Sequence, residues 1–441
     1  MTGVRSEVTG WNEAPEVVIT GIGAVTPVGL GREATWQALL EGRSGVGPIT
    51  AFDASELPVR IAAQVRDFDP EAVLQGKRLP RSARFTQMAV AASREAVADA
   101  GLDVAGGDAE AAEDGGWSLA SGVDPDRVGV VINAAVAGFD TIERATRQVA
   151  GLDQGRLNPH FVSSSLANMP ACEVAIDLGV HGPVTAGALA CASGAYAVLE
   201  ARRLILCGEA DVVVCGGTDA AIARVMLEGL ITMGALSRRN DDPEGASRPF
   251  AADRDGFVFG EGSVVMVLES AAHAARRTAV PYAAVAGGAL TSDAFHVSAP
   301  EPAGAFASAA ITRALRSAGV KPEQVDYVCA HGTGTRANDV TETRAIRSAF
   351  GDAAERLAIS SPKSMVGHLI GGAGALGVMV DALAIRDEIV PPTTNLFVPD
   401  PDCDLDYVPN VARRMPVQVA TANAFGFGGQ NCVVVVTSPS G

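Results

Sequence analysis

The chain has 441 residues, of which 48% are hydrophobic and 19% charged, and its formal net charge is −17. This composition predicts a packed globular protein and excludes a largely disordered chain or a coiled coil. The negative charge repels nucleic-acid phosphate and anionic lipid, so we expect no nucleic acid and no membrane among its partners.

The cysteines and the apolar runs indicate the compartment. Seven cysteines are present and none belongs to a CxxC pair, so neither a disulfide framework nor a zinc site is predicted. The N-terminus lacks the apolar core of a signal peptide, and no stretch offers about 18 uncharged apolar residues. We therefore expect a reduced, cytoplasmic protein without a bound metal or a membrane span.

In chain order, a polar tail over residues 1–15 precedes an apolar run at 17–27, which predicts a buried strand that enters a glycine turn. Further strand-like runs stand at 128–134, 210–217, 262–269, 325–330 and 431–436, with Ala-rich helical stretches between them. Such alternation predicts an α/β fold in which helices cover the sheets.

Two segments repeat the same series of predicted elements. Residues 96–102 and 123–128 indicate a helix, a glycine stop, a proline-led turn and a strand, and residues 314–325 do the same. This favours a duplicated half over a short-period solenoid, with chance similarity as the alternative. The first copy then carries an acidic, Gly-rich insertion over residues 103–122, which predicts an exposed loop.

A candidate nucleophile follows the third predicted strand. The apolar residues 183–190 predict a strand, and residues 191–208 predict a helix that a glycine ends. Cys191 thus lies at a helix N-terminus, where the helix dipole lowers a thiol pKa from about 8.5 towards neutrality. A buried structural cysteine is the alternative, and it is the role expected of the other six cysteines.

Two of the six histidines, His331 and His368, lie in glycine-rich loops after predicted strands. Functional groups collect at the carboxyl ends of strands in α/β sheets, and a neutral imidazole there can donate to an oxyanion or relay a proton. A single histidine in such a loop is more often a hydrogen-bonded structural residue than a catalytic one. Together with Cys191 they form a coherent set for acyl transfer.

Three further residues and one loop support this set. Lys363 and Glu342 could form a buried ion pair that holds the histidines, whereas Asp339 and Glu342 have the spacing of a helix capping box. In the loop at 423–431, glycines surround Phe427. The glycines allow backbone angles that could aim an N–H group at an oxyanion or let the aromatic ring move. The alternative is a tight turn around an aromatic side chain of the core.

At these residues the sequence resembles the β-ketoacyl-acyl-carrier-protein synthases, of the elongating type with a Cys-His-His triad. The motifs are VVITGIGAVTPVG, ACASG, AHGTGTRAND, SSPKSMVGH and NAFGFGGQN, spread over nearly the whole chain. RRNDDPEGASRPF and PDPDCDLDYVPN especially resemble the ketosynthase subunits of bacterial type II polyketide synthases. The resemblance implies a thiolase-like, five-layered αβαβα fold with two related halves, which we expect at residues 16–275 and 276–441.

The resemblance also implies the chemistry. Cys191 would be acylated from the phosphopantetheine thioester of an acyl carrier protein, with no bound cofactor. His331 and His368 would promote decarboxylation of a malonyl carrier protein and stabilise the enolate, which attacks the acyl group. The backbone N–H groups of Cys191 and Phe427 would form the oxyanion hole, and Phe427 would also act as a gate.

The remaining residues match further positions of the family. The implied roles are pantetheine binding for Thr333 and Thr335, an ion pair of Lys363 with Glu342 supported by Asp339, and an acyl pocket that includes Val136, Phe161 and Phe425. The main hypothesis is polyketide chain elongation, in a heterodimer with a homologous chain-length factor. The alternatives are a homodimeric fatty-acid elongation synthase and a non-catalytic chain-length factor, and the intact Cys191, His331 and His368 count against the last.

Overall fold

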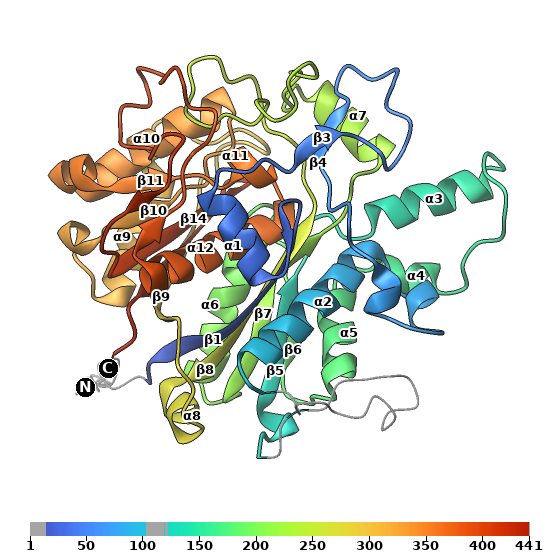
Figure 1. Ribbon diagram of the computed structural model, residues 1–441, viewed down its shortest axis with the longest axis horizontal. Helices are drawn as coiled ribbons and strands as arrows, with labels where there is room; N and C mark the ends of the chain where they lie inside the picture. Colours follow the sequence, from blue (N-terminus) through green and yellow to red (C-terminus); the bar gives the residue numbers. More distant parts are fainter. Residues whose placement is uncertain (1–14, 103–118, 120–121, 441) are drawn as a thin grey trace, which may run out of the picture.

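The computed structural model describes residues 15–102, 119 and 122–440. The predictions for the polar tail and for most of the insertion at 103–122 therefore lie outside the described residues. Within them, ten strands form one mixed sheet in the order β11-β10-β14-β15-β9-β1-β8-β7-β5-β6, and the short β2 pairs with β1. Figure 1 shows this sheet with helices on both sides.

The sheet consists of two halves with the same topology. The first half contains β1 (Val17–Thr26), β5 (Val128–Asn133), β6 (Val184–Thr185), β7 (Val212–Asp219) and β8 (Gly262–Ser270). The second contains β9 (Ala283–Ser292), β10 (Tyr327–Cys329), β11 (Ala358–Ser360), β14 (Val419–Gly426) and β15 (Gln430–Thr437). Both halves place their strands in the order third, second, fourth, fifth, first, and in both the second strand is parallel to its two neighbours. The predicted duplication is present.

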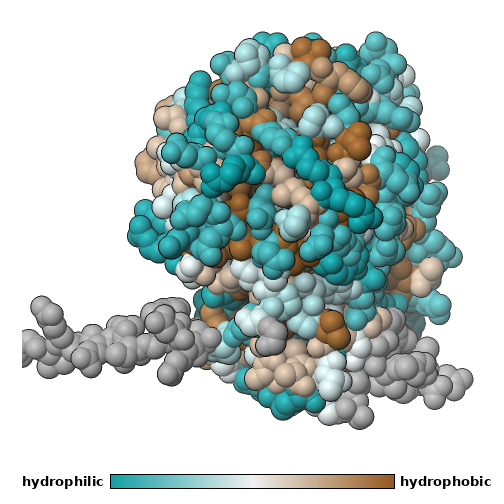
Figure 2. Space-filling model, turned by 60° about the vertical axis from the view of Figure 1, so that its left-hand side comes forward, coloured by the Kyte–Doolittle hydropathy of each residue, from teal (hydrophilic) through white to brown (hydrophobic). Residues whose placement is uncertain are grey.

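Helices complete five layers. Helices α2 (Arg84–Asp99) and α5 (Met169–Leu178) cover the first half of the sheet, and α9 (Ala305–Ala318) covers the second, with α10 (Arg336–Phe350) packed against α9. Between the two halves lie α6 (Ser193–Leu206) and α12 (Ala373–Asp387), which contact strands of both. The predicted αβαβα arrangement is therefore confirmed. In Figure 2 the molecule is turned so that the left-hand side of Figure 1 comes forward, and most side chains on the visible face are hydrophilic.

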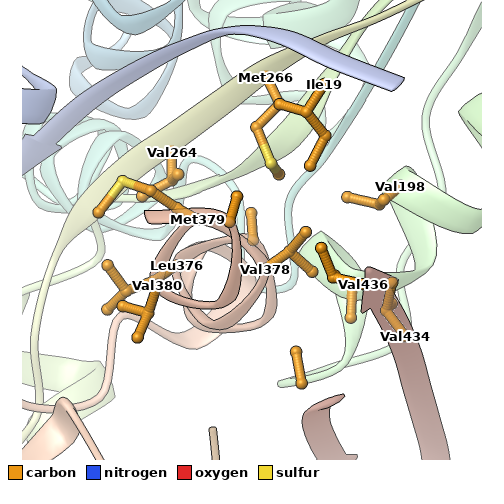
Figure 3. Close-up of a cluster of buried hydrophobic side chains, with 14 of the residues drawn as sticks. Ile19, Val198, Val264, Met266, Leu376, Val378, Met379, Val380, Val434 and Val436 are labelled. Atoms are coloured by element: carbon orange, nitrogen blue, oxygen red, sulfur yellow. The ribbon is translucent and has the colours of Figure 1, made fainter. Parts of the chain in front are cut away.

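The central layer is the main core. Every residue of α12 from Ala373 to Ile385 is buried, as expected of a mostly apolar helix that lies between the two halves of the sheet. Figure 3 shows Leu376, Val378, Met379 and Val380 of this helix among side chains of the surrounding strands. Because α12 begins five residues after His368, this rigid core holds the loop that carries the histidine.

The repeated segments have the predicted local structure. Helix α2 is followed by Gly101 at φ 65°, and α9 by Gly319 at φ 67°, the left-handed conformation in which glycine ends a helix without strain. A 3₁₀ turn then leads into the strand in both copies, at Pro125–Arg127 before β5 and at Pro322–Gln324 before β10.

The strand predicted at 183–190 is shorter than expected. Only β6 (Val184–Thr185) pairs with β5, and after it Gly187 N–H donates to the Asn133 side chain at 2.6 Å instead of to a neighbouring strand. The other elements are α1 (Arg32–Leu40), β2 (Gly29–Leu30), β3 (Val46–Pro48), β4 (Ile61–Ala63), α3 (Phe139–Val149), α4 (Phe161–Ser165), α7 (Arg224–Thr232), α8 (Ala271–Arg276), α11 (Lys363–Val366), β12 (Ile389–Val390) and β13 (Arg413–Arg414). No helix in the described ranges is long and apolar enough to cross a membrane.

Candidate active site

Cys191 lies in a strained turn just before α6. The preceding Ala190 has φ 46°, a conformation that residues with a side chain rarely adopt. The Ser193 hydroxyl holds the turn, because it accepts from Leu189 N–H at 2.9 Å and donates to Ala190 O at 2.7 Å. The turn directs the thiol into the molecule, where Cys191 is only 8% exposed.

The expected low pKa of Cys191 is wrong. Burial raises the pKa of the thiol to about 11, against the lowering effects of Lys363 and of the backbone N–H groups of Phe427 and Cys191. Desolvation disfavours the thiolate more than these groups favour it. The resting thiol is therefore protonated at neutral pH and needs a base when it reacts.

His331 follows β10, and a buried carboxylate fixes its backbone. Glu342 accepts from His331 N–H at 2.8 Å, from Gly332 N–H at 2.7 Å and from the Asn423 amide at 3.1 Å. Lys363 makes no ion-pair contact with Glu342 among the described residues, although the charge of Glu342 acts to raise the pKa of Lys363. Glu342 supports the histidine through its main chain instead.

Asp339 holds the next part of the same loop. Its carboxylate accepts from Gly334 N–H at 3.2 Å and Phe250 N–H at 2.9 Å, and it lies 3.1 Å from the Arg254 guanidinium. The capping box considered for Asp339 and Glu342 is absent, since α10 begins at Arg336 and Thr335 is its N-cap. Both acids lie inside the helix and face the loop.

His368 lies between α11 and α12. Its Nδ1 accepts from Ile370 N–H at 3.2 Å, so the neutral ring carries its proton on Nε2, which has no partner among the described residues. Burial lowers the pKa of both His331 and His368 well below the usual value, and the charge of Lys363 lowers both further. Both imidazoles are neutral.

The structure brings the three predicted catalytic residues together. The sulfur of Cys191 and one ring nitrogen each of His331 and His368 lie within 4.8 Å of one another. The two rings meet edge to face with centroids 5.6 Å apart. Such a set of atoms could ligate a metal ion, but the buried Lys363 amine, whose charge acts on all three groups, disfavours a cation at this position.

The turn between β14 and β15 completes the centre. The backbone N–H groups of Phe427 and Cys191 both act to lower the pKa of the thiol, so both lie near the sulfur, where a thioester oxygen would develop charge. Gly426 permits this approach, because a Cβ there would lie 2.6 Å from Leu189 O. The Phe427 side chain is 40% exposed.

A cavity of about 600 Å³ leads to these atoms. Its lining includes the predicted Val136, Thr333, Thr335, Phe425 and Phe427. The Thr333 and Thr335 hydroxyls lie 3.0 Å apart.

Phe161 does not line this cavity. It lies on α4, which packs against α3 and α5, so the described single chain does not bring it to the cavity and its role in the acyl pocket stays a prediction.

Sequence reasoning missed most of the apolar wall and one polar residue behind it. The missed wall residues are Met226, Leu230, Phe257, Phe259 and Ile370. They carry no sequence signal that distinguishes them from core residues. Asp219 was also missed, although a charged residue at the end of a buried strand is a recognisable signal.

Comparisons with known proteins agree with this geometry. The model of the β-ketoacyl synthase N-terminal domain matches residues 14–274, and that of the C-terminal domain matches residues 282–397. The 3-oxoacyl-[acyl-carrier-protein] synthase 2 of Synechocystis sp. is 45% identical over 95% of this chain and 97% of its own length. The enzyme of the same name from Coxiella burnetii is 42% identical over 96% and 99%.

Solved structures are similar as well. The ishigamide ketosynthase/chain length factor has a TM-score of 0.86 at 35% identity, over 97% of this chain and 100% of that one. A type II PKS acyl-carrier protein in complex with its ketosynthase bound to the hexaketide has a TM-score of 0.85 at 30% identity, with the same coverage. With a buried Cys-His-His centre on a duplicated αβαβα fold, this chain belongs to the β-ketoacyl synthase family.

Proposed function

We propose that this enzyme condenses an acyl group held on Cys191 with a malonyl group on an acyl carrier protein, which yields a β-ketoacyl carrier protein and CO₂. One observation carries the proposal. A buried thiol, whose pKa two nearby backbone N–H groups act to lower, lies within 4.8 Å of two ring nitrogens in the lining of a cavity of about 600 Å³.

The first step is acylation of the thiol. The Cys191 sulfur attacks the carbonyl carbon of an acyl-pantetheine thioester, and a neutral imidazole takes the thiol proton, as a pKa of about 11 requires. The carbonyl oxygen becomes an oxyanion that the N–H groups of Cys191 and Phe427 stabilise. The pantetheine thiolate then leaves with the proton, and the acyl group remains on the sulfur.

The second step forms the carbon–carbon bond. The carbon–carboxylate bond of the malonyl thioester breaks, CO₂ leaves, and the electron pair forms an enolate whose oxygen accepts from His368 Nε2–H and from His331. A neutral imidazole suits this role because it retains a proton to donate. The enolate carbon then attacks the acyl carbonyl, and Cys191 leaves as a thiolate that takes a proton from solvent, because loss of the carboxylate as neutral CO₂ consumes one proton.

The cavity mouth suits a phosphopantetheine arm. The paired hydroxyls of Thr333 and Thr335 can hydrogen-bond its amides, and Arg336, an exposed residue that lines the same cavity, can meet an acidic carrier protein. No resident cofactor is needed, because the substrates arrive as activated thioesters. Carrier-bound substrates and seven free cysteines favour work in the cytoplasm.

We favour polyketide chain elongation as the pathway, since the similar solved structures include a ketosynthase bound to a hexaketide and one named with a chain length factor. Fatty-acid elongation is the second candidate, because relatives 45% and 42% identical are named 3-oxoacyl-[acyl-carrier-protein] synthase 2. Product mass from the enzyme with carrier protein, alone and with any homologous partner subunit, separates them. A polyketide subunit requires the partner, whereas a fatty-acid synthase elongates alone.

A dimer is expected at the β6 edge. This strand ends the sheet, so its outer N–H and C=O groups are open to pairing. Exposed apolar side chains surround it, with Ile176 at 70%, Val162 at 66% and Leu166 at 47%. On α3, which projects beside them in Figure 1, only Ala145 is buried. Ile176→Glu should lower the mass measured by light scattering, and an unchanged mass would place the interface elsewhere.

The direct test of the reaction is intact mass after incubation with an acyl carrier protein substrate. The wild-type chain should gain one acyl group, and Cys191→Ala should gain none. Cys432→Ala is the matched control, because Cys432 is a buried cysteine outside the cavity lining. Acylation or elongation by Cys191→Ala would refute the assignment of the nucleophile.

A further inference from the structure

A single buried carboxylate at the end of β7 binds four backbone N–H groups. Asp219 is 1% exposed. Its Oδ1 accepts from Val136 N–H at 3.1 Å and Ala137 N–H at 3.0 Å. Its Oδ2 accepts from Ala135 N–H at 3.0 Å and Gly371 N–H at 2.8 Å. These four donors use both oxygens fully, so an ionised carboxylate fits this position better than any neutral side chain.

The four donors belong to two segments that are far apart in sequence. One follows β5 and the other follows His368, and each contains a non-glycine residue in the left-handed region, Ala137 at φ 53° and Ile370 at φ 52°. Such conformations persist only where the surroundings hold them. Asp219 holds both, because it binds Ala137 N–H and the N–H directly after Ile370.

Both segments reach the reaction site. Val136 and Ile370 line the cavity, and Ile370 N–H donates to His368 Nδ1 at 3.2 Å. That hydrogen bond places the imidazole proton on Nε2, the nitrogen that faces the reacting atoms. A movement of the Gly371 N–H would therefore move Ile370 and turn or retautomerise His368.

We propose that Asp219 is a positioning residue that couples the shape of the acyl pocket to the orientation and tautomer of His368. The inference rests on the proposed function. It adds one residue that influences both the choice of acyl group and the stabilisation of the enolate. Asp219 touches no substrate. It acts through Val136 on which acyl group fits, and through Ile370 on how the enolate is stabilised.

The test compares Asp219→Asn with the wild type, both as full chains with carrier protein substrates. The asparagine amide has one acceptor oxygen, so one pair of N–H groups loses its acceptor. Asp177→Asn is the matched control, since Asp177 is a buried carboxylate that is paired with Arg78 and Arg94 outside the cavity lining. Three quantities are measured: acetylation of Cys191 by intact mass, kcat and KM for malonyl decarboxylation, and relative rates with short and long acyl groups.

We expect Asp219→Asn to accept acetyl at a rate within about twofold of the wild type, and to lose about 10–100-fold in decarboxylation kcat with little change in KM. The preference between short and long acyl groups should also change. If Asp219→Asn is insoluble, Asp219→Asn with Ala137→Gly replaces it, because glycine adopts a left-handed conformation without strain.

The proposal is overturned if decarboxylation by Asp219→Asn matches that of Asp177→Asn, if acylation and decarboxylation fall by the same factor, or if acyl preference is unchanged. Failure of the wild type itself to acylate or decarboxylate would refute the proposed function instead, so the two failures are distinguishable.

Discussion

A methyl group added at Gly217 should move His368 away from Cys191. Gly217 lies in β7, where it contacts both Gly194 at the start of α6 and Gly371 after His368. A Cβ at position 217 would lie 2.1 Å from Gly371 O and 2.8 Å from Gly194 Cα. Both neighbours are backbone atoms, so no side chain can rotate away to make room.

The size of the effect follows from these distances. Ordinary contact begins at 3.4 Å, so the segment that carries His368 must move by roughly 1 Å in Gly217→Ala, since a close-packed interior has no space to absorb the methyl group. Overpacking of this kind costs about 1–3 kcal/mol of unfolding free energy. A displacement of about 1 Å at a reacting group can cost roughly 10²-fold in rate.

The assay is decarboxylation of malonyl carrier protein together with urea unfolding. Gly229→Ala on α7 is the control, because a Cβ there meets nothing within 4 Å, and a helical Gly-to-Ala change should stabilise by about 0.5–1 kcal/mol with unchanged activity. If Gly217→Ala retains a rate within twofold of the wild type, the close approach does not position the site and the reasoning fails.

Three further predictions concern charge and cavity shape. Burial raises the pKa of Asp381 well above its usual value. The folded state therefore keeps a proton that the unfolded chain releases above about pH 4. The free energy of unfolding should then fall by up to about 1.4 kcal/mol per pH unit as the pH rises from that value towards the pKa of the folded state. Asp381→Asn should remove this slope in urea titrations between pH 5 and 7, and parallel curves for variant and wild type would contradict it. The charge of Lys363 lowers the pKa of His331 and His368, so Lys363→Met should shift the acidic limb of the decarboxylation pH profile to higher pH, and an unmoved limb would argue against this coupling. Val136→Phe should narrow the cavity and lower the rate with long acyl groups at least about tenfold relative to acetyl, whereas an equal loss for both would show that Val136 does not limit acyl length.

The sequence was sufficient to find the three residues that the structure brings together. Cys191, His331 and His368 each follow a strand-like run and stand among glycines or other small residues, and a polar residue in such a place has few structural uses. The strand runs and the repeat also predicted the layers correctly, because burial on both faces leaves a continuous apolar signal.

The pKa of Cys191 and the hydrogen-bond partners of Glu342 could not be predicted in the same way. The helix N-terminus favours a thiolate at Cys191, but burial in the folded chain raises the pKa of the thiol to about 11. Lys363 and Glu342 have complementary charges, yet the N–H groups of His331 and Gly332 bind the carboxylate. Residue types indicate which pairs are possible, and only the packed backbone decides among competing donors.

Duplication explains how the site is assembled, because each pair of equivalent strands contributes one group from each half. The third strands, β6 and β11, precede Cys191 and His368, the second strands precede Val136 and His331, and the fourth strands lead to Asp219 and Phe427.

The middle layer has the same symmetry, since a Cβ at Gly194 would meet Ala375 N at 2.7 Å and one at Gly374 would meet Ala195 N at 2.5 Å. Such reciprocal contacts arise at a two-fold axis. The candidate active site therefore lies near the approximate two-fold axis that relates the two halves of the fold. One half supplies the proposed nucleophile and Val136, the other supplies the two imidazoles and the N–H of Phe427, and residues of both halves line the cavity.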